Sequence, residues 1–116
     1  PMLHVPDVRA SAAWYEALGF ARRADHAEDG TLTWAALTFG DSEVMLSAGG
    51  RASDAPRRDV DLYVHARDVE AWFSRLPPGV VVVEPPHDTE YGQREFIIRD
   101  LNGFWLTFGE PMRTPP

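Results

Sequence analysis

The chain has 116 residues, a net charge of −7, no cysteine and no lysine, so its 11 Lys/Arg positions are all arginine. This length predicts a single globular domain, since domains typically span roughly 100–200 residues. The absent residue types exclude disulfides, thiolate nucleophiles, iron–sulfur clusters, Schiff-base chemistry and a P-loop lysine. The acidic charge argues against a nucleic-acid or anionic-membrane partner, because phosphate binding needs a basic face.

The first half of the chain has the pattern of one helix among four strands. Asp7 stands where a helix N-cap belongs, apolar residues recur at helical spacing up to Leu18, and Gly19 is typical of a helix end. Asp29-Gly30 is a strong hairpin signal. The expected helix covers residues 8–18, and the expected strands are Met2–Val5, 20–28, Thr31–Phe39 and 43–47.

The same pattern begins again after a stretch of glycine, serine, proline and charged residues, which is typical of a linker. Asp68 is the second candidate N-cap, and Val69, Trp72, Phe73 and Leu76 follow at the spacing of an amphipathic helix, which Pro77-Pro78-Gly79 should end. Strands are expected at 60–66, 80–84, Gln93–Arg99 and 104–108, with a loop over 85–92. The resulting division is module 1 (1–48), linker (49–59), module 2 (60–110) and a frayed tail (111–116).

The two halves correspond residue by residue around their helix starts. Asp7-Val8 matches Asp68-Val69, and His4 matches His65 at the preceding strand. An internal repeat of this kind predicts duplicated half-domains that share one core. We therefore expect an α+β fold of two βαβββ modules, which form a curved mixed sheet with a cavity between the halves, a usual place for a small-molecule site.

Two segments carry a resemblance to a known family, and the resemblance extends over nearly the whole chain. Asp-Val-x-x-Ser-x-x-Trp-Tyr-x-x-Leu-Gly-Phe over residues 7–20 resembles the first helix of the vicinal oxygen chelate superfamily, which holds glyoxalases, extradiol dioxygenases, and fosfomycin- and bleomycin-resistance proteins. Residues 91–96 and 99–103 are similar to the closing segment of the branch that contains bleomycin-resistance and glyoxalase-like proteins. The resemblance implies paired βαβββ modules, usually in a homodimer.

The resemblance also implies where a metal ion would bind in the enzymes of the superfamily. Its four inward strand positions map here onto Asp61, Thr107, Met45 and a position at or before Pro1. Only one of these is a plausible ligand, whereas divalent metals want three or four well-placed donors. We therefore expect no metal and no cofactor, as in the metal-free binding branch.

Several polar and aromatic residues are expected to line the cavity. Asp61, Tyr63 and His65 share one strand face, although an ordinary solvent-facing surface would show the same alternation. Trp105 and Thr107 lie opposite the apolar positions of the last strand, where Trp105 could equally pack in a dimer interface. Glu95 stands in an otherwise apolar strand, either as a ligand carboxylate or general base whose pKa Arg94 or Arg99 steers, or in a cross-strand ion pair. The candidate ligand-binding residues are Trp34, Asp61, Tyr63, His65, Tyr91, Glu95, Trp105 and Thr107.

These residues predict a homodimeric binding protein that sequesters an aromatic or cationic antibiotic or metabolite without a metal. The alternative is a lyase, isomerase or dioxygenase of the glyoxalase type, with a divalent metal at a remodelled site of His4, His65 and Glu95. A third possibility is a small regulatory dimer without a ligand. The sequence has no signal-peptide pattern and no apolar run long enough to cross a bilayer, which predicts a cytoplasmic protein.

Overall fold

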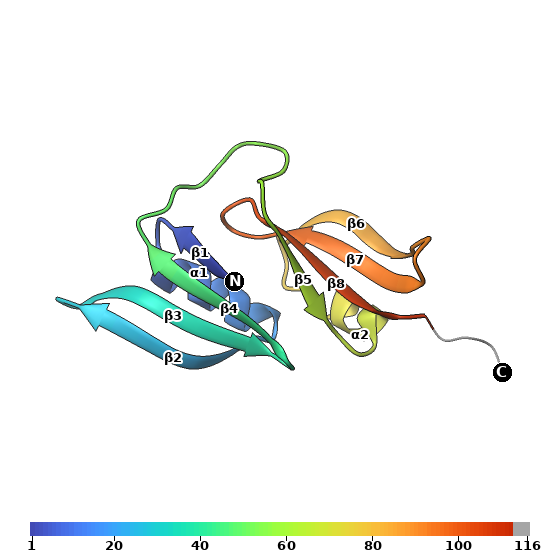
Figure 1. Cartoon of the computed structure of the whole chain (residues 1–116), viewed down its shortest axis with the longest axis horizontal. Helices are drawn as coiled ribbons and strands as arrows, with labels where there is room; N and C mark the ends of the chain where they lie inside the picture. The colour runs from blue at the N-terminus through green and yellow to red at the C-terminus, as the bar shows by residue number, and fades with distance from the viewer. Residues whose placement is uncertain (113–116) are drawn as a thin grey trace.

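The computed structural model describes residues 1–112, which form two βαβββ modules in sequence (Figure 1). The first module comprises β1 (Met2–Val5), α1 (Val8–Leu18), β2 (Ala21–Glu28), β3 (Thr31–Phe39) and β4 (Ser42–Ala48). The second comprises β5 (Asp61–His65), α2 (Val69–Ser74), β6 (Val81–Asp88), β7 (Gln93–Arg99) and β8 (Trp105–Pro111). Pro111 therefore ends a strand instead of starting the expected tail, of which residues 113–116 lie outside the described residues.

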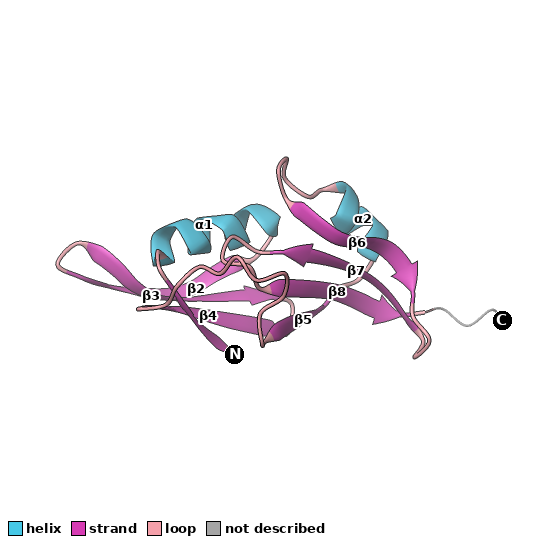
Figure 2. Cartoon of the chain, turned by 90° about the horizontal axis from the view of Figure 1, so that it is seen from above, coloured by secondary structure: helices cyan, strands magenta, loops and turns pink. Residues whose placement is uncertain are grey.

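Each module contains one four-stranded mixed sheet, in the orders β1-β4-β3-β2 and β5-β8-β7-β6. The pairs β1–β4 and β5–β8 are parallel, and the remaining pairs are antiparallel. Both helices lie on the same side of the two sheets, which leaves the other face of each sheet without a helix (Figure 2). The expected α+β fold of paired βαβββ modules is confirmed. Within residues 1–112, no helix is long and apolar enough to cross a lipid bilayer.

The predicted helix starts are confirmed in atomic detail. The side chain of Asp7 accepts a hydrogen bond from the backbone N–H of Ala10 at 3.0 Å, and that of Asp68 accepts one from Ala71 at 3.2 Å. Gly19 closes α1 with a φ of 120°, a conformation that a residue with a Cβ rarely adopts. Both modules thus begin their helix with the same aspartate cap, as the repeat predicted.

One boundary differs clearly from the sequence prediction. β6 continues to Asp88, so the first half of the loop expected over 85–92 is strand. Pro85 and Pro86 lie within it, and the pairing with β7 is irregular between Glu84 and His87. β6 stands at the edge of its sheet. Prolines are tolerated there because the side of an edge strand that faces away from the sheet needs no N–H donor.

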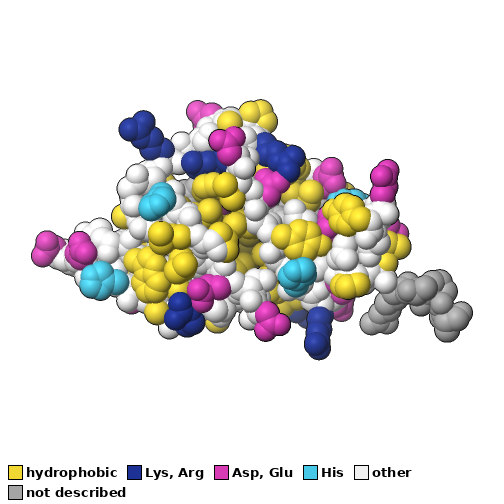
Figure 3. Space-filling view, in the orientation of Figure 1, with side chains coloured by type: hydrophobic (Ala, Val, Ile, Leu, Met, Phe, Trp, Pro, Cys, Tyr) yellow, Lys and Arg dark blue, Asp and Glu magenta, His cyan; other side chains and the backbone are white. Residues whose placement is uncertain are grey.

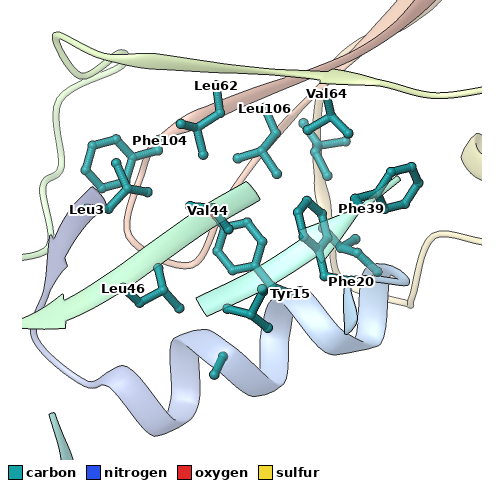
Figure 4. Close-up of a cluster of buried hydrophobic side chains, with 14 of the residues drawn as sticks. Leu3, Tyr15, Phe20, Phe39, Val44, Leu46, Leu62, Val64, Phe104 and Leu106 are labelled. Atoms are coloured by element: carbon teal, nitrogen blue, oxygen red, sulfur yellow. The ribbon is translucent and has the colours of Figure 1, made fainter. Parts of the chain in front are cut away.

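A single hydrophobic core joins the two modules (Figure 4). The ring of Phe39 on β3 lies 4.7 Å from the ring of Trp72 on α2 and 5.5 Å from the ring of Phe108 on β8, centroid to centroid. Buried aliphatic and aromatic side chains from both sheets and α1 continue this contact; they include Leu3, Tyr15, Phe20, Val44, Leu46, Leu62, Val64, Phe104 and Leu106. The two halves therefore share one core, as expected for duplicated half-domains.

A buried hydrogen-bond network crosses the same boundary. The hydroxyl of Tyr15 on α1 donates to Asp100 Oδ2 at 2.7 Å, and Asp100 Oδ1 accepts from the backbone N–H groups of Asn102 and Phe104 at 2.8 Å each. The amide of Asn102 also donates to Ser11 Oγ at 3.0 Å. These bonds hold the β7–β8 turn of the second module against the helix of the first. Burial raises the pKa of Asp100, although its hydrogen bonds favour the ionised form.

This raised pKa predicts a pH dependence of stability. The folded state binds the Asp100 proton more tightly than the unfolded state, so its stabilising effect is complete at acid pH and is lost as the pH rises through the folded-state pKa. The variant Asp100→Asn has no such proton. Its free energy of unfolding relative to the wild type should therefore increase from acid pH up to the folded-state pKa and then level off. Urea denaturation across this range measures the difference, and a pH-independent difference would contradict the assignment.

Candidate functional site

The face of the second sheet that points away from α2 collects most of the predicted site residues. On β5, Leu62 and Val64 are buried in the core, while the intervening side chains point the other way. Cross-strand pairing places Asp61 beside Trp105, and Tyr63 beside Thr107. We call this surface the open face of module 2; it comprises Asp61, Tyr63, His65, Glu95, Trp105, Thr107 and Gly109. The predicted alternation of β5 and β8 is therefore confirmed.

A carboxylate and two phenols form the centre of this face. Glu95 on β7 is only 2% exposed. Its Oε2 accepts a hydrogen bond from the hydroxyl of Tyr63, and its Oε1 accepts one from the hydroxyl of Tyr91, each at 2.8 Å. The structure thus brings together three of the predicted residues, one from β5, one from β7 and one from the turn that precedes β7.

Gly109 makes this arrangement possible. It lies on β8, opposite Glu95 on β7 and opposite His65 on β5. A Cβ at this position would overlap the Tyr63 hydroxyl and lie 2.8 Å from Tyr63 Cζ. The tyrosine ring therefore passes over the glycine to reach the carboxylate. The sequence signal for this role is an isolated glycine at the end of a strand pattern, which often marks a close approach of another group.

Both phenols keep their protons at neutral pH. Partial burial is the main cause that raises the pKa of Tyr63, and its hydrogen bond to Glu95 adds to the effect. The pKa of Tyr91 is raised chiefly by its own hydrogen bond to Glu95. Ionising either phenol would place a second negative charge beside the carboxylate, which is unfavourable. The cluster therefore carries one negative charge, held by Glu95.

The linker packs against one end of the open face, where its Arg57 contacts the sheet. Arg57 was not among the residues predicted for the site. Its guanidinium pairs with the carboxylate of Asp61 and lies 4.3 Å from the centre of the Trp105 ring. The indole N–H of Trp105 donates to the carbonyl oxygen of Pro56 at 3.1 Å. Asp61 and Trp105, both expected to line the cavity, are cross-strand neighbours, and the chain's own arginine contacts both of them. Arg57 lies in the linker, four positions before Asp61. Outside a helix or strand, the spacing of two residues does not predict that their side chains meet.

The surface around these residues is hollowed in two places. A cavity of about 130 Å³ lies between the modules and is lined by Asp61 and Tyr63 together with Phe20 and Val44. A larger, open hollow of about 670 Å³ borders His65, whose ring lies 5.1 Å from that of Tyr63. Figure 3 views the molecule from this side and shows apolar side chains gathered over both modules.

Trp34 is separated from the other predicted site residues by its position in the first sheet. It lies on β3, where its cross-strand partners are His26 and Ser47. Because the neighbouring pair, Ala35 and Leu46, belongs to the core, Trp34 points to the opposite face, which no helix covers. Within the described part of one chain, Trp34 therefore does not join the Tyr63–Glu95–Tyr91 cluster.

The arginines expected to steer Glu95 act elsewhere. Arg94 forms ion pairs with Glu70 on α2 at 2.6 Å and with Asp88 at 3.1 Å, on the helix side of the sheet. Arg99 donates to the carbonyl oxygen of Ala55 in the linker. The alternation of β7 explains the outcome for Arg94, which points to the face opposite Glu95; Arg99 shares the face of Glu95 but pairs with Trp105, four positions further along the strand. The expectation that Arg94 or Arg99 steers the carboxylate was wrong, because both arginines have other partners and two tyrosines bind Glu95 instead.

The donor set that a catalytic metal would need is not assembled in the described chain. Residues 1–112 contain no group of three His, Asp or Glu side chains placed to hold an ion. His4 lies on β1 in the first sheet, whereas His65 and Glu95 lie in the second. Asp61, the one plausible ligand among the mapped positions, is paired with Arg57. These residues therefore do not fit a divalent metal within one chain.

Comparisons with known proteins agree on one fold. The family model described as "Glyoxalase/Bleomycin resistance protein/Dioxygenase superfamily" matches residues 1–108. TioX from Micromonospora sp. ML1 superposes with a TM-score of 0.79 at 24% identity, over 97% of this chain and 96% of that chain. A bleomycin-binding protein complexed with bleomycin gives 0.74 at 21% identity, over 95% and 94%.

A further solved structure, TnmS3, is described as an antibiotic binding protein from Streptomyces sp. CB03234. It superposes with a TM-score of 0.64 at 23% identity, over 95% of this chain and 93% of that chain. At these identities the solved structures establish the fold that they share with this chain. No curated protein matches the sequence.

The role of Gly109 gives a prediction about stability. The variant Gly109→Ala should push Tyr63 off Glu95 and lower the free energy of unfolding by about 1–3 kcal/mol, the usual range for overpacking. In the Tyr63→Ala variant, the added methyl group of Gly109→Ala has more room. The loss in free energy of unfolding caused by Gly109→Ala should therefore be smaller there by about 1 kcal/mol or more. Urea denaturation of the wild type, both single variants and the double variant measures this coupling. Additive effects would show that Tyr63 does not pass over Gly109.

Proposed function

We propose that this chain, which belongs to the glyoxalase/bleomycin resistance protein/dioxygenase superfamily, binds and sequesters an aromatic or cationic small molecule. An antibiotic or a metabolite would fit this description, and binding requires neither a metal ion nor a reaction. The observation that carries the proposal is the Tyr63–Glu95–Tyr91 cluster on the open face of module 2. Small-molecule sites combine apolar and aromatic walls with a few convergent polar groups, and this cluster supplies such groups.

The aromatic side chains around the cluster support a planar or cationic ligand. Tyr63 and Tyr91 are 41% and 69% exposed, which is high for large aromatic residues. Aromatic rings stack on flat heterocycles and attract cations to their faces. The buried carboxylate adds a negative charge beneath them. Together these groups favour an aromatic ring, a positive charge or both.

The proposal includes a homodimer. The uncovered faces of the two sheets lie on the same side of the chain, so a ligand on one of them has solvent on its other side (Figure 2). Binding sites usually bury most of a ligand, about 70–90% of its surface. The first module of a second copy could close over the open face of module 2 and add residues such as Trp34 to the site. In the superfamily that the sequence resembles, homodimers are usual.

Ligand titration tests the binding function directly. Bleomycin and planar cationic dyes should quench tryptophan fluorescence and raise the melting temperature, because a ligand that binds only the folded state stabilises it. Trp34→Phe and Trp105→Phe should reduce the quenching, since both indoles lie on uncovered faces. Trp14→Phe, on the helix side, is the matched control and should leave it unchanged. The absence of any response across the panel would exclude sequestration of these ligands.

Light scattering tests the dimer separately. The wild type should have twice the mass of one chain at micromolar concentration. Met2→Asp places a charge on the uncovered face of the first sheet and should shift the protein towards the monomer. Leu101→Asp is a matched control in the β7–β8 turn, because the two side chains are 50% and 51% exposed. A monomeric wild type would overturn the dimer, and equal effects of both variants would place the interface elsewhere.

A further inference from the structure

We propose that the oxygen atoms of Tyr63 and Tyr91, with the buried carboxylate of Glu95 behind them, form an acceptor site for a protonated amine. This inference rests on the proposed function and narrows its ligand class. The predicted ligand carries a primary or secondary ammonium group next to an aromatic ring. Three features of the site favour such a group: the buried carboxylate, the direction of the hydrogen bonds and the positions of the chain's own cations.

The carboxylate is the first feature. Glu95 is almost completely buried, and among residues 1–112 it takes part in none of the ion pairs. His87 is its cross-strand neighbour on β6, but the His87 ring lies 3.1 Å from the carboxylate of Glu84 instead. An ionised carboxylate away from water needs hydrogen bonds or a cation. Two phenols supply the hydrogen bonds to Glu95. In the proposed complex, the ammonium group of the ligand is the cation that binds next to them.

The direction of the hydrogen bonds is the second feature. Each phenol has one proton and donates it to Glu95, so the phenol oxygens keep lone pairs that accept hydrogen bonds, one of which comes to Tyr91 from Thr89. The amide oxygen of Gln93 lies 3.3 Å from the Tyr63 hydroxyl and adds another acceptor. The cluster therefore presents several acceptors and a net negative charge. An ammonium group has up to three N–H donors and the matching charge, whereas an anionic ligand has neither.

The chain's own cations are the third feature. Asp61 lies two positions before Tyr63 on the same face of β5, and the guanidinium of Arg57 already occupies the space between Asp61 and Trp105. At this end of the open face, a carboxylate beside an aromatic ring thus already holds a nitrogen cation, the guanidinium of Arg57. Of the two carboxylates on the open face, Asp61 is thus neutralised from within the chain. Glu95 is the one left for a cation of the ligand.

A set of probes with one ring system tests the inference. 1-Naphthylmethylamine is a cation with N–H donors, its N,N,N-trimethyl derivative is a cation without them, 1-methylnaphthalene is neutral, and 1-naphthylacetate is an anion. Calorimetric or fluorescence titration of the wild type should give the tightest binding for the amine. It should bind about tenfold or more tightly than 1-methylnaphthalene, the size expected for hydrogen bonds to a charged group. The trimethyl derivative should lose most of this advantage.

The variants assign the effect to the cluster. Glu95→Gln removes the charge but keeps the shape, and Tyr63→Phe and Tyr91→Phe remove one acceptor each but keep the ring. Each should reduce the ratio of amine to 1-methylnaphthalene affinity several-fold, with 1-methylnaphthalene itself little changed. Glu90→Gln is the matched control, because Glu90 is an exposed acid beside Tyr91 and should leave the ratio unaltered. Melting temperatures show that every variant is folded.

The outcomes separate this inference from the proposed function. Binding of 1-methylnaphthalene without any advantage for the amine would overturn the amine site but leave a small-molecule site. The amine site would also be overturned if the trimethyl derivative bound as tightly as the amine. A Glu95→Gln variant with an unchanged ratio of amine to 1-methylnaphthalene affinity would overturn it as well. Failure of every probe and of bleomycin to bind would overturn both.

Discussion

The contact between the two modules determines what the rest of the molecule can do. Aromatic rings from β3, α2 and β8 meet at Phe39, and the hydrogen bond from Tyr15 to Asp100 crosses the same boundary. Because each sheet has a single helix, the apolar side chains of one face are covered and those of the other are not. The two sheets lie side by side with both helices on one side, which leaves both uncovered faces on the other side of the molecule (Figure 2). The shared core therefore fixes how the two uncovered faces lie relative to each other.

The open face of module 2 differs from the core in how its polar groups are satisfied. In the network around Asp100, the hydrogen-bond partners Tyr15, Asn102 and Phe104 are themselves buried, and the carboxylate holds a turn in place. Glu95 is equally buried, yet its two partners are exposed tyrosines that reach it from the surface. Replacing this carboxylate and its phenols by apolar residues would remove a desolvation cost. A buried charge with partners at the surface is thus better suited to recognition than to stability.

Local signals predicted the parts of the fold that depend on local interactions. The aspartate caps, the glycine after α1 and the alternation of β5 and β8 follow from neighbouring residues, and each is found in the structure. The position of Arg57 depends on the path of the linker, which folds back over Trp105. The partners of Glu95 depend on sheet register, which places Gly109 where a tyrosine ring can pass. Neither can be derived from spacing alone.

The same fold can support metal chemistry or simple binding, and the side chains at a few strand positions decide between them. In this chain, Thr107 and Met45 occupy two of the positions mapped for a metal, and Asp61 is held by Arg57. The convergent polar groups lie instead one strand further into the second sheet, around Glu95 on β7. Each oxygen of this carboxylate accepts one phenol hydrogen bond, and these bonds strengthen the two phenol oxygens as acceptors. The polar groups of the open face are therefore gathered around Glu95 and not at the strand positions mapped for a metal ion.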